Sequence, residues 1–577
     1  MKFFCVLCFL CGLSSAALAL DREAFTIAKY DLEIRLEPEQ QRLGARGKIT
    51  LRNDTSHPQK IAALQISSSL NWRSIRVGGK PVQFVSQPYT SDIDHTGVLS
   101  EAIVTLPAEI APTDSVVVEI GYEGVIPQDT SRLTRIGVPE EIAKHSSWDQ
   151  ISSSFTAVRG AGYVAWYPIA TESADFSEGN SLFEVIDRWK AREAKEGMKV
   201  NLCTQVPEST KLSMWMNELP HQGGNGGGYD HHICTVYRFE PFGTVTPSFV
   251  VADYILTGSK NPLNLLSLPG HEDGAATYSS ALDPAIKFVS GWFGAPTNEV
   301  IIADFADPHS APFESGSLLM ASMAAEDSKL AGTNLVHELV HSALPSSRPW
   351  VYEGLAHFAE ALYRQQQGGR QAALDLLGEH RAAFLDSEKE VSAALEKNAS
   401  QKSVGEPLAD TFDETYYRSK AAYVWWMLRD MVGDDALRES LRKYRSDEDK
   451  DPKYVEQLVE AAAKCDLGWF FDDWVYHDRG LPDLRVQSVH PWTTEKGVQF
   501  VTVTLENRGT AGAEVPFTIH FEGGEVAKRL EVRARSTATM RVELPLAASE
   551  VVVNDGSVPE VDLTHKVFEV SVPAIEK

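Results

Sequence analysis

The sequence is short of positive charge. Its 54 Lys and Arg residues are outnumbered by 80 Asp and Glu residues, which gives a formal net charge of -26 at pH 7. Nucleic-acid backbones are bound by clustered Lys and Arg side chains. The charge balance therefore argues against a nucleic-acid partner, and the acidic excess is accounted for by solubility.

Long apolar runs are missing after the first twenty residues. A membrane-spanning helix needs about 20 consecutive apolar residues, so we expect no membrane span. The first residues, MKFFCVLCFLCGLSSAALAL, combine Lys2, a short apolar run and an Ala-x-Ala site that ends at Ala19. This pattern is typical of a secretory signal peptide over residues 1–19. We therefore expect an exported protein, either periplasmic or secreted.

Cysteine is scarce, and half of the six cysteines lie in the signal segment. Cys203, Cys234 and Cys465 remain, and their spacing is not that of a zinc finger. Cys203 and Cys234 fall in two expected strands of one domain, where they could form a disulfide in an oxidising compartment. Buried thiols are the alternative, and the sequence leaves both open.

The chain is too long for one hydrophobic core, and its apolar periodicity divides it into three regions. Residues 20–257 contain short alternating runs such as YDLEIRLEP and SVVVEIGYEG, which predict an N-terminal antiparallel β domain. Within it, residues 131–197 stay unassigned. Residues 258–480 predict a mainly helical domain in which NEVIIADFA is one buried strand. Residues 481–577 predict an immunoglobulin-like β sandwich of about seven short strands, so the fold class is multidomain α+β.

The segment HELVHSALPSSRPWVYEGLAHFAE begins at His337 and contains the strongest chemical signal. His337 and His341 are four residues apart on an expected helix, so both imidazoles lie on one face. Two histidines at this spacing can share one zinc ion, with Glu338 beside the first. A surface helix with two ordinary histidines is the alternative. We favour the metal because the helix is apolar around its histidines, and buried imidazoles need polar partners.

The third metal ligand is predicted from the turn between two helices. The first helix should end near Pro345, and Pro349 suits the first position of the second helix. Two helices joined by so short a turn run roughly antiparallel. Glu353 should then face His341 at the same level, which makes Glu353 the expected ligand.

Glu360 lies on the same face as Glu353 but roughly 10 Å further along the helix axis. At that level it should stand behind His337, where a carboxylate orients the ligand imidazole. We expect His357, one turn beyond Glu353, to be a packing residue, because a catalytic zinc site keeps one position open for water.

The segment WVYEGLAHFAE, which ends at Glu360, resembles the W-L-N-E-G-F-A-x-Y-x-E segment of the aminopeptidase N-type gluzincin metallopeptidases. The resemblance implies one Zn²⁺ per chain and agrees with Glu353 as the third ligand. AIKFVSGWFGAPTNEVIIADF is similar to the opening of that family's thermolysin-like catalytic domain, and YDLEIRLEPEQQRLGARGKITLRNDT to its saddle-shaped N-terminal β domain. The interval between His341 and Glu353 is about seven residues shorter than the family's spacing.

The resemblance also implies the catalytic residues of a zinc-dependent peptidase. Glu338 would be the general base that activates a water. YYRSKAAYVWWMLRDMVG is similar to the family's Y-E-K-G-A helix, whose Tyr stabilises the oxyanion. An ungapped overlay places Tyr417 on that residue, and Tyr416 is its rival.

One motif of the family's exopeptidases departs from its pattern here. Their G-A-M-E-N string, whose Glu holds the substrate's free amine, is replaced by APFESGS. Glu314 in this string is either the amine anchor or a loop carboxylate. We expect a peptidase acting on peptide substrates, with an aminopeptidase ahead of an endopeptidase. A non-catalytic peptide-binding protein on a peptidase scaffold is the alternative from another class.

Overall fold

The structure is a computed structural model. The signal segment expected at residues 1–19 lies outside the described residues. These are 20–178, 181–205, 212–218, 220–226, 232–243, 245–260, 262–297, 299–324, 328–397, 407–411, 413–495, 497–560, 562–564 and 566–570.

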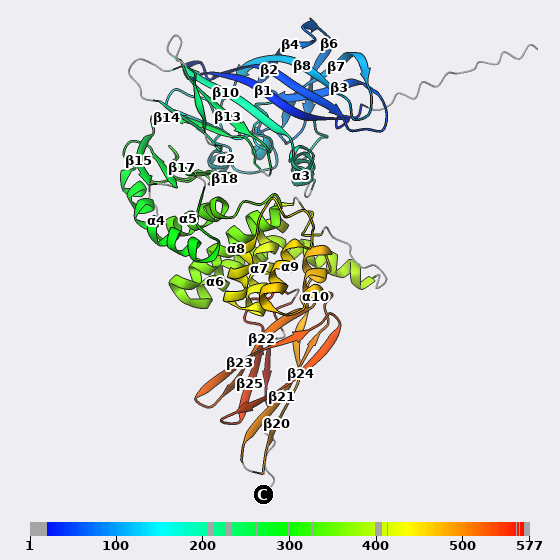
Figure 1. Cartoon of the computed structure of the whole chain (residues 1–577), viewed down its shortest axis with the longest axis vertical. Coiled ribbons are helices and arrows are strands. Elements are labelled where there is room, and N and C mark those ends of the chain that lie inside the picture. Colours follow the sequence, from blue (N-terminus) through cyan, green and yellow to red (C-terminus); the bar gives the residue numbers. More distant parts are fainter. Residues whose placement is uncertain are drawn as a thin grey trace, which may run out of the picture.

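The N-terminal region is built on an eight-stranded sheet, drawn in blue through cyan to green in Figure 1. Strand β1 (Phe25–Glu37) forms because its apolar residues alternate, so that Tyr30, Leu32, Ile34 and Leu36 are buried on one face. It pairs antiparallel with β2 and parallel with β10. The other strands, in sheet order, are β12 (Pro220–Gly226), β13 (His232–Phe239), β10 (Gly197–Gln205), β2 (Arg42–Asn53), β8 (Ser115–Val125), β4 (Leu70–Val77) and β5 (Lys80–Pro81).

Two three-stranded sheets and three helices complete this region. One sheet holds β3 (Gln59–Ser67), β7 (Val98–Ile110) and β6 (Gln83–Thr90), and the other β11 (Ser213–Met216), β14 (Phe249–Ala252) and β9 (Phe155–Val158). The helices are α1 (Ser131–Arg135), α2 (Glu140–Ser146) and α3 (Ser181–Glu193), and the short 3₁₀ turn η1 (Pro38–Gln40) follows β1. Figure 1 shows α2 and α3 on the side of the β region that faces the helical region.

A disulfide joins two neighbouring strands of the large sheet. Cys203 on β10 and Cys234 on β13 are directly opposite each other in the antiparallel register, and their sulfurs are bonded. Of the two alternatives that the sequence leaves open, the structure contains the disulfide. Cys465 is a free thiol.

The middle region contains a five-stranded sheet where the sequence predicted one strand. Its order is β15 (Ile255–Lys260), β16 (Leu263–Ser267), β17 (Val300–Ala303), β19 (Leu318–Met320) and β18 (Phe313–Ser315). Strand β17 is the predicted one, and β16, β18 and β19 are too short to show a periodicity in the sequence. The predicted domain boundary at residue 258 falls inside β15, which pairs with β16. Strand β18 is antiparallel to β19 and lies at the edge of the sheet.

Two helices of the middle region, α4 (Glu272–Trp292) and α5 (Ser328–Ala343), pack against this sheet, and the others lie further from it (Figure 1). Next comes α6 (Pro349–Lys397), which joins two predicted helices across a kink at Gly369, where φ is 79°. The others are the π-helical turn η2 (Thr415–Lys420), α7 (Ala421–Val432), α8 (Asp434–Lys443), α9 (Tyr454–Ala463), α10 (Gly468–Phe471) and the π-helical turn η3 (Asp472–Tyr476). Among the described residues, no helix is both long enough and apolar enough to cross a membrane.

The C-terminal region consists of a three-stranded and a four-stranded sheet, drawn in orange and red in Figure 1. The first holds β20 (Leu484–Thr493), β21 (Gln499–Asn507) and β24 (Ser536–Leu544). The second holds β23 (Gly524–Val532), β22 (Ala513–Phe521), β25 (Ala548–Val553) and β26 (Val567–Glu569). Both sheets share one apolar cluster with the helical region, and Trp474 donates a 2.8 Å hydrogen bond to the carbonyl of Gly512.

Candidate metal centre

Helix α5 carries three polar site residues through the core of the middle region. Its apolar neighbours Leu335, Val336, Leu339 and Val340 are buried, so the helix is held on several sides. His337, Glu338 and His341 are themselves at most 5% exposed. Buried polar groups require partners, and for the two histidines these come from α6 and from strand β18.

Four side chains converge at the end of α5. The ligand atoms of Glu314, His337, His341 and Glu353 all lie within 4.8 Å of one another. Glu353, in the first turns of α6, places its carboxylate oxygens 3.8 Å from Nε2 of His337 and 3.9 Å from Nε2 of His341. The turn between α5 and α6 thus brings Glu353 opposite both histidines.

Glu314 reaches the same place from the sheet edge. Its Oε1 atom lies 2.6 Å from Nε2 of His337 and 3.0 Å from Nε2 of His341. Burial alone would lower the pKa of His337, but the carboxylates of Glu314 and Glu360 outweigh it and raise that pKa well above its usual range. Glu314 is therefore no isolated loop carboxylate: it belongs to the cluster.

The imidazoles are held from behind by α6. Glu360 places Oε1 2.8 Å from Nδ1 of His337, and its Oε2 lies 3.2 Å from Nδ1 of His357. The ring of Tyr352 stacks on that of His341 with 3.8 Å between centroids. With Nδ1 of His337 engaged by Glu360, its Nε2 is the nitrogen that faces the cluster.

Glu338 is a buried carboxylate with no hydrogen bond to the described residues. It is 1% exposed, and both of its oxygens lack a partner there. Burial first, and the charge of Glu314 second, raise the pKa of this carboxyl well above its usual range. Such a group beside two imidazoles is suited to accept a proton.

The cluster fits a zinc ion by the chemistry of its donors. Two imidazole nitrogens and one carboxylate are the protein ligands of many catalytic zinc sites. The orphaned oxygens of Glu338 and the Oε2 atom of Glu353, which is buried without a hydrogen-bond partner among the described residues, are polar atoms that a cation or its water would satisfy. His337, His341 and Glu353 would hold the ion.

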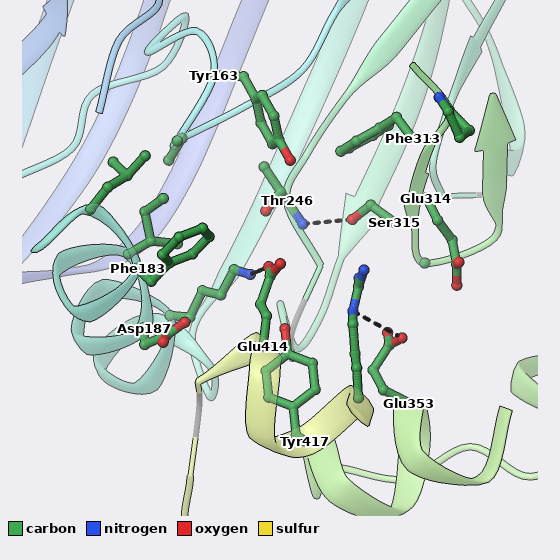
Figure 2. A pocket seen from close by; sticks show the side chains of 18 of the residues that line it. Tyr163, Phe183, Asp187, Thr246, Phe313, Glu314, Ser315, Glu353, Glu414 and Tyr417 are labelled. Atoms are coloured by element: carbon green, nitrogen blue, oxygen red, sulfur yellow. Dashed lines mark hydrogen bonds and ion pairs between the residues drawn. The ribbon is translucent and has the colours of Figure 1, made fainter. Parts of the chain in front are cut away.

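A cavity of about 240 Å³ opens beside the cluster, between the N-terminal and middle regions (Figure 2). Glu314 and Glu353 line one side of it, and Figure 2 shows their carboxylates pointing into the same space. Helix α3 contributes Phe183, Asp187 and Lys190 from the opposite side. The cavity is therefore bounded by both regions of the chain.

Tyr417 lines this cavity, whereas Tyr416 packs beneath Lys420, whose Nζ lies 5.1 Å above its ring. Figure 2 shows the hydroxyl of Tyr417 close to Glu414, and Glu414 accepts a 3.0 Å hydrogen bond from Lys190. Burial, followed by the charge of Glu414, raises the pKa of Tyr417 well above its usual range, so the phenol remains a hydrogen-bond donor. Of the two tyrosines that the sequence leaves open, Tyr417 is the one at the cavity.

Four further residues at the site were not predicted from the sequence. Asp187 and Lys190 lie in the segment that stayed unassigned, and nothing in their local pattern points to the centre. Tyr352 and Arg418 are each adjacent to a predicted site residue, and adjacency was the one available signal. Arg418 places Nε 3.5 Å from Oε2 of Glu353.

The sequence matches no protein-family model and no curated protein. Among solved structures, the chain resembles the M1 zinc metallopeptidase from Deinococcus radiodurans. A point mutant of that enzyme is 16% identical, with a TM-score of 0.46, over 80% of this chain and 96% of the other. The mutant bound to a Tyr-Ser-Ala substrate has 15% identity and a TM-score of 0.48 over the same shares. The unmutated enzyme has 15% identity and a TM-score of 0.44, over 79% and 94% of the two chains.

Proposed function

We propose that the protein is a zinc-dependent peptidase, and more narrowly an aminopeptidase. The observation that carries the proposal is the convergence of His337, His341 and Glu353 beside the orphaned carboxylate of Glu338. A bound Zn²⁺ would lower the pKa of a water molecule and polarise the peptide carbonyl. Mere peptide binding would require no buried proton acceptor next to such a centre.

Three side chains of the protein have roles in the proposed reaction. Glu338 takes the proton of the attacking water and passes it to the leaving amine, because it is the buried carboxylate whose oxygens are unengaged. Tyr417 donates a hydrogen bond to the developing oxyanion from the wall of the cavity. Glu360 keeps Nε2 of His337 directed at the metal.

Glu314 is proposed to bind the free α-amine of the substrate, which makes the enzyme an exopeptidase. Its carboxylate, on the edge strand β18, lines the cavity and has a 19% exposed side chain, compared with 9% for Glu353. The more accessible carboxylate suits a substrate ammonium and the more enclosed one a metal. A peptidase without this anchor, cleaving within chains, is the second candidate because the Gly-Ala-Met part of the exopeptidase string is missing.

We also propose that the protein acts outside the cytoplasm. The N-terminal segment has the pattern of a signal peptide. The Cys203–Cys234 disulfide supports an oxidising compartment.

Hydrolysis of matched peptides with a free or an acetylated α-amine tests the exopeptidase proposal. We expect the free-amine peptides to be cleaved and the acetylated ones to be spared. Glu314→Gln should raise KM for free-amine peptides while zinc content stays near one per chain. Equal cleavage of both peptides would favour an endopeptidase, and loss of zinc from Glu314→Gln would instead make Glu314 a ligand.

A further inference from the structure

Two cavities meet at Glu314 and Arg418. The cavity described above, of about 240 Å³, is lined by both residues. A second cavity of about 470 Å³ is also lined by both, together with Asn334 and Leu330 of α5. Among the described residues, Arg418 is the one basic residue that borders both of these cavities, and it lies beside the candidate metal centre.

The other basic residues of the first cavity already have partners. Arg132 donates hydrogen bonds of 2.6 Å to the backbone carbonyls of Asp92 and Gly162. Lys190 is paired with Glu414 at 3.0 Å. Both cations are therefore held in place by the protein itself.

Arg418 is held by one loose contact. Its Nε atom lies 3.5 Å from Oε2 of Glu353 and has no hydrogen-bond partner among the described residues. The side chain remains 33% exposed. A guanidinium carries five N–H donors in a planar fork that matches the two oxygens of a carboxylate. Most of these donors are available to a ligand in the cavities.

In the proposed enzyme, the neighbouring carboxylates do not neutralise the positive charge of Arg418. Glu353 would be engaged by the metal, Glu414 is paired with Lys190, and Glu314 would be occupied by the substrate's ammonium. The centre would thus present a site for a positive group at Glu314 and a site for a negative group at Arg418.

We propose that Arg418 binds a carboxylate of the substrate and makes the enzyme prefer peptides that carry one close to the free α-amine. This inference rests on the proposed function. The carboxylate can come from an acidic side chain of the first residue or from the C-terminus of a dipeptide. A purely structural role, in which Arg418 does no more than fix Glu353, makes a different prediction, because its loss would weaken metal binding and leave the choice of peptide unchanged.

The test measures binding, so it does not depend on hydrolysis. Zinc-loaded Glu338→Gln protein is titrated by calorimetry with two matched pairs of peptides. The first pair is Glu-Ala amide and Gln-Ala amide, which isolates a side-chain carboxylate. The second pair is Ala-Ala and Ala-Ala amide, which isolates the C-terminal carboxylate. Charge-assisted hydrogen bonds predict that in one pair the acid binds about tenfold or more tightly than the amide.

Three further variants in the same background complete the design. Arg418→Gln should reduce that ratio to near one, and Arg418→Lys should retain part of it. Arg188→Gln, on the exposed side of α3 and outside the lining of the cavity, removes the same charge and should retain the full ratio. Zinc content is measured on each sample.

Three results would overturn the proposal: no preference for the acid in either pair, a preference that survives Arg418→Gln, or zinc loss confined to Arg418→Gln. The last would assign Arg418 to holding Glu353. Unmutated protein that hydrolyses no peptide, while the Arg418-dependent ratio persists, would contradict the proposed peptidase function and leave the carboxylate site standing.

Discussion

Glu360 and His337 form the contact that orients the candidate centre: Oε1 of Glu360 lies 2.8 Å from Nδ1 of His337. This contact directs Nε2 of the same ring towards Glu353 and Glu314, at 3.8 and 2.6 Å. Glu353 lies about one turn into α6 and faces the metal-binding side of the imidazoles, whereas Glu360 lies about three turns into α6 and contacts His337 from behind.

Because Glu353 and Glu360 lie on different sides of the imidazoles, variants of the two residues should retain different amounts of zinc. Glu353→Ala should lose zinc, since it removes a ligand, whereas Glu360→Ala should keep most of it with an affinity lowered by about 10–100-fold. Zinc per chain after dialysis against a calibrated chelator measures both. The opposite order, with zinc lost from Glu360→Ala alone, would refute the assignment of Glu353.

Tyr417 and Tyr416 are adjacent and both buried, so each is a control for the other. Tyr417→Phe should lower kcat by a factor of about 100–1000, because a donor to the oxyanion is removed, and should leave KM nearly unchanged. Tyr416→Phe should have little effect on kcat. Steady-state kinetics on one peptide decides, and equal losses in the two variants would remove Tyr417 from the mechanism.

Glu193 on α3 should make the free energy of unfolding depend on pH. Burial raises the pKa of this carboxyl from 4.5 to about 8, and its Oε2 has no hydrogen-bond partner among the described residues. Because the pKa of Glu193 is higher in the folded than in the unfolded state, its contribution to the free energy of unfolding is fully present below pH 4.5. That contribution is lost as the pH rises through 8. Unfolding of the unmutated protein should therefore become easier over this interval.

Glu193→Gln removes this dependence. Because the backbone N–H of Ile27 donates to Glu193 at 3.2 Å, the amide can keep that bond. The variant should match the unmutated protein near pH 4.5 and be more stable at pH 8 by on the order of 2–4 kcal/mol. Denaturant unfolding at both pH values measures this, with Glu184→Gln on the exposed side of α3 as control. A gain that is the same at both pH values would show that ionisation is not its cause.

The Cys203–Cys234 disulfide closes a loop with a sequence separation of 31. The loop-entropy relation gives roughly 3–4 kcal/mol of stabilisation for a loop of that length. A double Cys→Ser variant should lower the melting temperature of the N-terminal region, and reductant should do the same to the unmutated protein. Cys465→Ser serves as control, and a double variant as stable as that control would exclude a stabilising disulfide.

The α5–α6 hairpin was predictable because its signals are local. Apolar periodicity marks both helices, and Pro345 and Pro349 bracket the turn, so the side on which Glu353 and Glu360 lie follows from helical geometry. The approach of Glu314 to His337 was not predictable in detail, because it depends on the pairing of β18 with β19, strands of three residues each. Lys190 reaches the cavity through packing between the N-terminal and middle regions, which leaves no trace in the local sequence, whereas the only signal for Arg418 was its place next to Tyr417.

The most direct test of the proposed mechanism is the substitution Glu338→Gln, measured for zinc content and for peptide hydrolysis in the same preparation. We predict about one zinc per chain, as in the unmutated protein, together with a loss of hydrolysis, because the amide cannot take the proton of the attacking water. Undiminished peptidase activity in this zinc-loaded variant would contradict it.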